Sequence, residues 1–163
     1  MKKIILQTTA ILLILAGVVA CGKENADIDM SKIDFSNIEN LYEQPLPVIQ
    51  KAVQGRWKLY QTCGGDAGCS YPPNTFITIA SNEIILENID SGEYIENSYS
   101  WKNKKVDVYG KTINSYVLWP GGADETAQSG MYFLSIKSDT LVSRSCSLTS
   151  DYTVFESIHT KVK

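Results

Sequence analysis

Residue types that could support catalysis are sparse in this chain of 163 residues. The single histidine, His159, lies close to the C-terminus, where a solvated surface side chain is the usual finding. Glu83, Glu87, Glu93 and Glu96 could supply two carboxylates for glycoside hydrolysis, but alternating acidic residues on strands usually form the solvated face. No nucleophile elbow, zinc-binding spacing or phosphate loop is present. The sequence therefore predicts no enzyme, no cofactor and no metal site.

Aromatic side chains are the stronger indication of a function. The chain contains three Trp, nine Tyr and four Phe residues, and aromatic walls suit small apolar or sugar ligands. Tyr99 and Trp101 would share one face of a strand, and Trp119 stands beside a long loop rich in glycine. We predict that Tyr99, Trp101 and Trp119 contact a ligand. The alternative is that Trp57, Trp101 and Phe133 fill the core, as aromatic side chains of small domains usually do.

The first twenty residues carry the three parts of a secretory signal. Two lysines form the charged start, an apolar run covers residues 4–20, and a small residue precedes Cys21. The unbroken apolar stretch, residues 10–20, is shorter than the roughly 18 to 20 residues that a membrane-spanning helix needs. We therefore predict a signal peptide at 1–20, with a membrane-spanning helix as the alternative.

The residues before Cys21 resemble the lipobox of bacterial lipoproteins, in which aliphatic and small residues precede an obligatory cysteine. Val18, Val19 and Ala20 occupy those positions. The resemblance implies that the Cys21 sulfur carries a diacylglyceryl group and that its amine becomes the mature N-terminus. Two or three acyl chains make a stable anchor, because each buried methylene contributes about 0.8 kcal/mol. The predicted location is the cell envelope, on the outer membrane, and a secreted chain without lipid is the alternative.

The segment after the predicted cleavage site is polar and acidic. It has too little apolar surface to pack alone, so we predict a lipidated N-terminus and flexible tether at 21–37, followed by one domain at 38–163. The formal net charge is −3, and loss of the two lysines of the signal leaves 13 basic and 18 acidic residues, or −5. This charge argues against a nucleic-acid partner.

Three cysteines remain once Cys21 is assigned to lipid: Cys63, Cys69 and Cys146. In an oxidising compartment they can form one disulfide and leave one thiol over. Glycines between Cys63 and Cys69 would let that short loop close, so this pair is the first choice, and a bridge from either residue to Cys146 is the second. A redox-active pair is disfavoured, because five residues rather than two separate the thiols.

The start of the predicted domain has helical signals. Ser36 and Glu39 fit a capping box, so a short helix is predicted to begin there and to be interrupted at Pro45. Pro47 can serve as the first residue of another turn or two of helix, which Gly55 would end.

From Gly55 onward, stretches rich in Ile, Val, Thr, Tyr and Trp alternate with turn residues, which is the signature of a strand meander. The nine candidate strands are 56–62, 75–80, 83–88, 93–102, 105–109, 112–119, 131–137, 140–146 and 152–161. The connections at 81–82, 103–104 and 138–139 have hairpin length. No helix intervenes, so neighbouring strands must pair antiparallel, and eight or nine of them would close into an up-and-down barrel. The predicted fold class is all-β with a short N-terminal helix.

Alternation along the first strand predicts that Trp57 points inward. Gly55-Arg56-Trp57, preceded by a short helix and followed by a meander, resembles the Gly-x-Trp opening of lipocalins and other calycins. The chain is most similar to the lipocalin-like lipoproteins of the Bacteroides group. The shared motifs are Cys-Gly-Gly-x-x-Gly-Cys at 63–69, Tyr-Pro-Pro at 71–73, Asp-Thr-Leu at 139–141 and Asp-Tyr-Thr at 151–153. The resemblance implies a lipocalin-like barrel with Gly55 and Trp57 in the core that closes it.

One feature of many calycins is missing from the expected place. They carry an arginine near the final strand that stacks on the indole of the Gly-x-Trp motif, whereas Glu156, Ser157 and Ile158 occupy the matching region here. Arg144, one predicted strand earlier, is the late arginine that could take this position.

The predicted function is a membrane-anchored, non-enzymatic, lipocalin-like lipoprotein that binds a small apolar or sugar-like ligand at the mouth of its barrel. The alternative is a protein-binding module, such as an inhibitor of a host hydrolase, because the net charge of −5 would steer a basic partner toward it. A third possibility is a structural envelope lipoprotein with a filled barrel and no ligand.

Overall fold

The computed structural model describes residues 28–64, 68–81, 83–121, 130–146 and 155–162. The chain divides into two compact units, Met1–Ile33 and Asp34–Lys163. In the described part of the first unit, Met30–Lys32 form a single turn of 3-10 helix, η1, in which no side chain is buried. Asp29 begins this turn and accepts a hydrogen bond from the Ser31 amide at 3.2 Å. The turn is therefore held by local polar contacts and not by a hydrophobic core.

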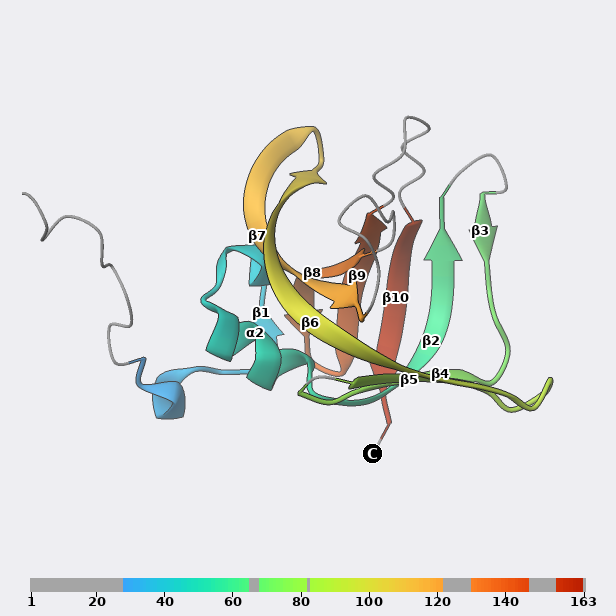
Figure 1. The fold of residues 1–163 in the computed structure, drawn as a ribbon. Coiled ribbons are helices and arrows are strands. Elements are labelled where there is room, and N and C mark those ends of the chain that lie inside the picture. The colour runs from blue at the N-terminus through green and yellow to red at the C-terminus, as the bar shows by residue number, and fades with distance from the viewer. Residues whose placement is uncertain (1–27, 65–67, 82, 122–129, 147–154, 163) are drawn as a thin grey trace, which may run out of the picture. The chain divides into compact units, whose positions relative to one another are not determined.

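Eight antiparallel strands of the second unit close into a barrel (Figure 1). Their order around the barrel is β8-β7-β6-β5-β4-β2-β10-β9, and β9 pairs again with β8. The strands are β2 (Gly55–Cys63), β4 (Thr75–Ile79), β5 (Glu83–Asn88), β6 (Glu93–Val108), β7 (Lys111–Pro120), β8 (Gly130–Lys137), β9 (Thr140–Cys146) and β10 (Phe155–Lys161). The predicted all-β meander and its closure are confirmed.

Strand β6 corrects the predicted strand count. Residues 93–102 and 105–109 were expected to form two strands with a turn at Asn103 and Lys104, but one continuous strand runs through them. The ladder with β7 is unbroken there, with Asn103 opposite Tyr116 and Lys104 opposite Ser115. The turn lies instead at Tyr109 and Gly110, whose φ angles of 52° and 81° suit a tight two-residue hairpin. Glycine at the second turn position permits this geometry, and the Asn-Lys pair has no such residue.

The segment before the barrel differs in part from the predicted helices. The capping box at Ser36 does not start a helix, because Asn37–Ile38 form strand β1, which pairs with Lys137 and Ile136 of β8. This edge of β8 is available because β7 pairs with β8 only through Leu118 and Met131. A 3-10 turn, η2 (Leu41–Glu43), and one short helix, α2 (Leu46–Val53), follow. The helix near Pro47 is therefore confirmed, and the helix at Ser36 is wrong.

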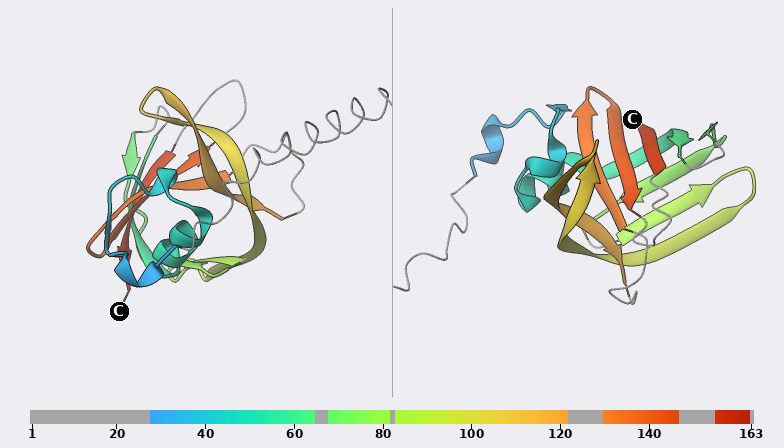
Figure 2. Two further views of the ribbon diagram at one scale, coloured as in Figure 1. Left: turned by 90° about the vertical axis from the view of Figure 1, so that its left-hand side faces the viewer. Right: turned by 90° about the horizontal axis from the view of Figure 1, so that it is seen from above.

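Helix α2 lies at one end of the barrel (Figure 2, left), and Trp57 packs against it there. The indole is 1% exposed, and its Nε1 donates a hydrogen bond to the Val53 carbonyl of α2 at 2.8 Å. Gly55 joins the helix to the strand with a φ of +134°, a conformation that other residues rarely adopt. The Lys161 ammonium lies 5.3 Å from the centre of the Trp57 ring, and the two residues are paired across β10 and β2. The cation over the indole is thus a lysine of the final strand.

Arg144 does not take the position that the resemblance to calycins left open for it. Its guanidinium pairs with Glu156 at 2.9 Å and lies 4.4 Å from the centre of the Tyr109 ring. Arg144 and Glu156 are opposite each other in the β9–β10 ladder, on the face away from the interior residue His159. The suggestion that Arg144 covers Trp57 is therefore wrong, and Lys161 supplies the expected cation.

The end of the β6–β7 hairpin packs onto the outer face of β8 and β9. A buried cluster joins Val106, Val108, Val117 and Trp119 of the hairpin to Tyr132 and Leu134 of β8. The Tyr132 hydroxyl also donates to the Asp107 carbonyl at 2.6 Å. In Figure 1, β6 and β7 curve together in the same direction. The domain thus has a second apolar layer outside the barrel, which we call the hairpin cluster.

Candidate functional site

Tyr99 and Trp101, two of the predicted ligand contacts, lie half-buried on the same face of β6. The Trp101 ring is 6.1 Å from the ring of Phe133, a core residue, and its Nε1 donates to the Ser81 carbonyl at 3.3 Å. Burial raises the pKa of the Tyr99 phenol, against the opposing effect of a hydrogen bond with Asn97. Each of these residues therefore has a partly buried apolar ring and a polar group that forms a hydrogen bond.

Trp119, the third predicted contact, lies elsewhere. It is opposite Ser100 in the β6–β7 ladder, so it is on the other face of the sheet from Tyr99 and Trp101. The side chain is 1% exposed and belongs to the hairpin cluster. The ammonium groups of Lys102 and Lys104 lie 5.5 and 5.1 Å from the centre of its ring. The three aromatic residues therefore do not line one common site.

His159 is a buried interior residue and not a surface residue as predicted. It is 3% exposed and lies between Leu59 and Leu141 in the ladders of β10 with β2 and β9. Its Nε2 forms a 2.9 Å hydrogen bond with the Ser143 hydroxyl, and its Nδ1 has no partner among the described residues. Burial lowers the pKa of His159 to about 4. The surface location was predicted from the short distance in sequence between His159 and the C-terminus. The burial of His159 is instead set by β10, which lies between β2 and β9 in the sheet.

The contact between Ser143 and His159 has the atoms of a nucleophile and a base but lacks other requirements of a hydrolase. Ser143 is 1% exposed, so its hydroxyl does not lie at the surface of the domain. A pKa of about 4 leaves the imidazole a weak base at neutral pH. Nδ1 also has no carboxylate partner among the described residues. The pair is better suited to hydrogen bonding than to catalysis.

Glu83, Glu87 and Glu96 lie on the outer face of β5 and β6, whereas Glu93, opposite Asn88, lies on the other face. Glu87 pairs with Arg56 at 3.1 Å, and the Tyr94 hydroxyl donates to Glu96 at 3.0 Å. A hydrogen bond between Glu83 and Glu96, together with their like charges, raises the pKa of Glu83. These contacts connect side chains of β2, β5 and β6 on one surface, and none of the three glutamates lines the cleft beside Trp57.

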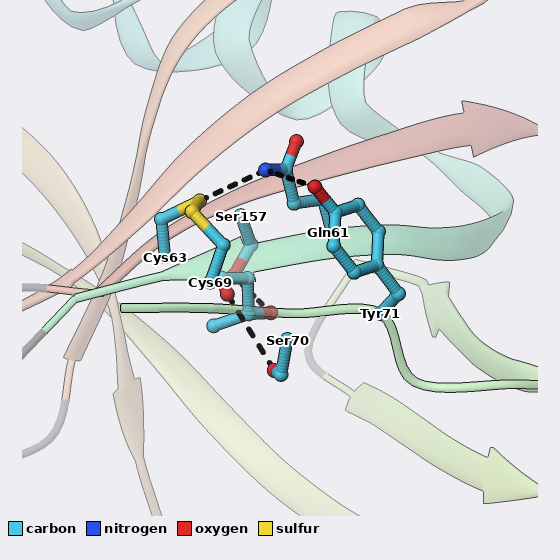
Figure 3. Close-up of a disulfide and its surroundings, with 7 residues drawn as sticks. Gln61, Cys63, Cys69, Ser70, Tyr71 and Ser157 are labelled. Carbon is cyan, nitrogen blue, oxygen red and sulfur yellow. Dashed lines mark hydrogen bonds between the residues drawn. A yellow bond between two sulfur atoms is a disulfide. The ribbon is translucent and has the colours of Figure 1, made fainter. Parts of the chain in front are cut away.

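Cys63 and Cys69 form the disulfide that was the first choice from the sequence (Figure 3). Cys69 lies in the short strand β3 (Cys69–Ser70), which pairs antiparallel with the end of β2. The Gly64 amide donates to the Gly68 carbonyl at 2.9 Å beneath the bridge. Gln61 donates to the Cys63 sulfur at 3.1 Å and to the Tyr71 hydroxyl at 3.3 Å. A bridge from either cysteine to Cys146 is therefore wrong.

A cleft of about 340 Å³ opens at the end of the barrel that Trp57 and α2 close. Its size falls in the range of about 300 to 1,000 Å³ that is typical of small-molecule sites. The lining residues are Phe35, Ser36, Lys51, Ala52, Gln54, Trp57, Ile136, Ser138, Asp139 and Lys161. Trp57 is the one predicted site residue in this lining, and Gly55, Tyr99, Trp101 and Trp119 are not part of it.

Sequence reasoning missed this cleft because its walls come from distant segments. The segment at Phe35 and Ser36 was assigned to the tether, and the turn at Ser138 and Asp139 was predicted only as a hairpin. Backbone hydrogen bonds join these parts: the Ser138 amide donates to the Ser36 carbonyl at 2.6 Å, and the Lys161 amide donates to the Asp139 carbonyl at 2.7 Å. Only the pairing of β1 with β8 and of β10 with β9 brings the segments together.

The described residues contain no group of three or more His, Cys, Asp or Glu side chains that could hold a metal ion. No helix in this part of the chain has both the length and the apolar character required to cross a bilayer. The predicted signal peptide at 1–20 and Cys21 lie outside the described residues. In comparisons with known proteins, no family model, curated protein or solved structure matches the chain.

Proposed function

We propose that this protein is a lipid-anchored, non-enzymatic, lipocalin-like binding protein of the cell envelope that holds a small apolar or sugar-like ligand in its barrel. An eight-stranded barrel is about the size at which the interior is either filled by side chains or holds one small ligand. The Trp57 indole lies under a lysine of the final strand, Lys161, where many calycins carry an arginine. The fold and this contact support the assignment to a lipocalin-like class.

The observation that carries the ligand proposal is the polar group buried in the interior. His159 Nδ1 has no partner among the described residues, although buried polar atoms are nearly always hydrogen-bonded. The side chains beside it, Leu59 and Leu141, are apolar. A mainly apolar ligand with one hydroxyl would suit this site, because a hydroxyl can donate to Nδ1 or accept from it, whichever tautomer is present.

The ligand proposal predicts a fluorescence change that depends on Trp101. Titration of the full-length chain in detergent micelles with decanol, decanoate or octyl glucoside should change tryptophan emission and saturate for at least one compound. Trp101→Phe should remove most of this change, since Trp101 is half-buried beside Phe133. Trp119→Phe is the matched control and should keep it, because Trp119 lies in the hairpin cluster.

A flat emission signal across all three compounds would contradict the small-ligand proposal. It would favour the alternative, in which the acidic outer face of β5 and β6 receives a basic protein. Tyr94, which is 57% exposed among these glutamates, would then be the contact to replace first.

The anchor proposal rests on Cys21 and the apolar segment before it. Cys21→Ala should abolish incorporation of labelled palmitate and move the protein from the membrane fraction to the soluble fraction. Cys146→Ala is the control, because this cysteine is not in the disulfide, and it should leave both readouts unchanged. Continued labelling of the Cys21→Ala chain would place the lipid elsewhere and contradict the proposal.

A further inference from the structure

The cleft beside Trp57 has an apolar floor and a polar rim. Ala52, Trp57 and Ile136 are buried and form the floor, and Phe35 is half-buried at one side. The rim carries two ammonium groups, one carboxylate, two hydroxyls and one amide, from Lys51, Lys161, Asp139, Ser36, Ser138 and Gln54. Polar groups that converge over an apolar base can fix the orientation of a bound small molecule.

The walls of this cleft are fixed without any ligand. Trp57 is held by its hydrogen bond to Val53, and the two backbone bonds from Ser138 and Lys161 join three separate segments. The Val162 amide also donates to the Arg56 carbonyl at 3.0 Å, which holds the end of β10 beside the start of β2. A preformed site loses little conformational entropy when a ligand binds.

The charge of the cleft has the opposite sign to the charge of the chain. Lys51 and Lys161 outnumber Asp139 along the rim, whereas the whole chain has a net charge of −3. The ion pairs found in the described part of the chain involve neither lysine. Lys51 lies in the last turn of α2. Its positive charge offsets the partial negative charge of the carbonyl groups at that end of the helix, which would otherwise repel an anion.

From these features we propose that the cleft is a second binding site, separate from the barrel interior, for a small organic anion with an apolar ring or chain. The apolar part lies against Phe35 and the Trp57 floor, and the carboxylate is held by Lys51 and Lys161. The serine hydroxyls on the rim can donate to the remaining oxygen lone pairs. The site takes a compact aromatic or aliphatic carboxylate, and a neutral molecule of the same shape binds less well.

The test uses the three tryptophans as separate reporters. Full-length protein labelled with ¹⁵N in its indoles, in detergent micelles, gives one Nε1–H signal for each of Trp57, Trp101 and Trp119. Titration with 2-naphthoate should shift the Trp57 signal and saturate. The amide 2-naphthamide, which has the same shape without the charge, should bind about 25-fold more weakly, the size expected for loss of two partly exposed ion pairs of about fivefold each.

Lys51→Gln should weaken 2-naphthoate binding by about fivefold and leave 2-naphthamide binding unchanged. Lys58→Gln is the matched control, because Lys58 is also exposed on β2 but does not line the cleft, and it should have no effect on either ligand. Equal binding of acid and amide, no effect of Lys51→Gln, or a shift confined to Trp101 would overturn the proposal. The last outcome would assign the ligand to the barrel interior, so failure of this site is distinguishable from failure of the proposed function.

Discussion

Replacement of Trp57 by alanine should lower the free energy of unfolding by about 3 to 5 kcal/mol, the usual cost of truncating a fully buried tryptophan. Three contacts would be lost at once: the packing of an indole that is 1% exposed, its hydrogen bond to Val53 and its contact with the Lys161 ammonium. Denaturant unfolding of the full-length chain, followed by far-ultraviolet circular dichroism, would measure the change.

The matched control for this prediction is Trp101→Ala. Trp101 is the same residue type, but it is only half-buried, so its truncation should cost less, about 1 to 3 kcal/mol. If both variants lose the same amount, or if Trp57→Ala loses less than Trp101→Ala, Trp57 does not close the barrel. The pair of variants therefore tests the structural part of the resemblance to calycins directly.

Acidification from pH 6.5 to pH 4 should destabilise the domain by about 3 kcal/mol through His159 alone. Burial lowers the pKa of this residue from 6.5 to about 4 in the folded chain, and each unit corresponds to about 1.36 kcal/mol. Between these pH values the unfolded chain binds a proton that the folded chain does not, so stability is complete above pH 6.5 and falls as the pH falls. Below pH 4 the folded state also binds the proton, and this contribution falls no further.

His159→Gln isolates this effect, because glutamine keeps a polar side chain but does not titrate. Unfolding free energies of both proteins at pH 7, 5.5 and 4 should show the steeper decline in the parent chain. Glu83 acts in the opposite direction, since a raised pKa in the folded state favours folding at low pH, but it is present in both proteins and cancels in the difference. Parallel pH profiles for the two proteins would show that folding does not change the pKa of His159 and would contradict this prediction.

The parts of the fold that the sequence predicted well are those set by neighbouring residues. Alternation along the chain located the strands, since side chains of a strand point to opposite faces in turn. The Cys63–Cys69 bridge was also predictable, because only five residues, three of them glycine, separate the two cysteines. In both cases the information lies within a few residues of the feature.

The errors concern features that depend on pairing between distant strands. The glycine at position 110 was a local signal for the turn, but the continuous course of β6 through Asn103 is set by β7, which pairs along the whole stretch. Likewise, Lys161 covers Trp57 only because β10 and β2 pair in that register. The burial of His159 and the cleft beside Trp57 follow from the same ladders. The sequence therefore indicated which residue types could form a site, but not where in the fold those residues lie.

The place of β10 in the barrel has a consequence for the order in which the chain can fold. This last strand pairs with both β9 and β2, and its Ser157 bonds to a residue 95 positions earlier, Thr62. Until it is synthesised, β2 and β9 each present an unpaired edge, and the interior around Trp57 has no lysine cover. Contacts of such long range also form slowly. A growing chain therefore leaves the barrel open until β10 has been synthesised.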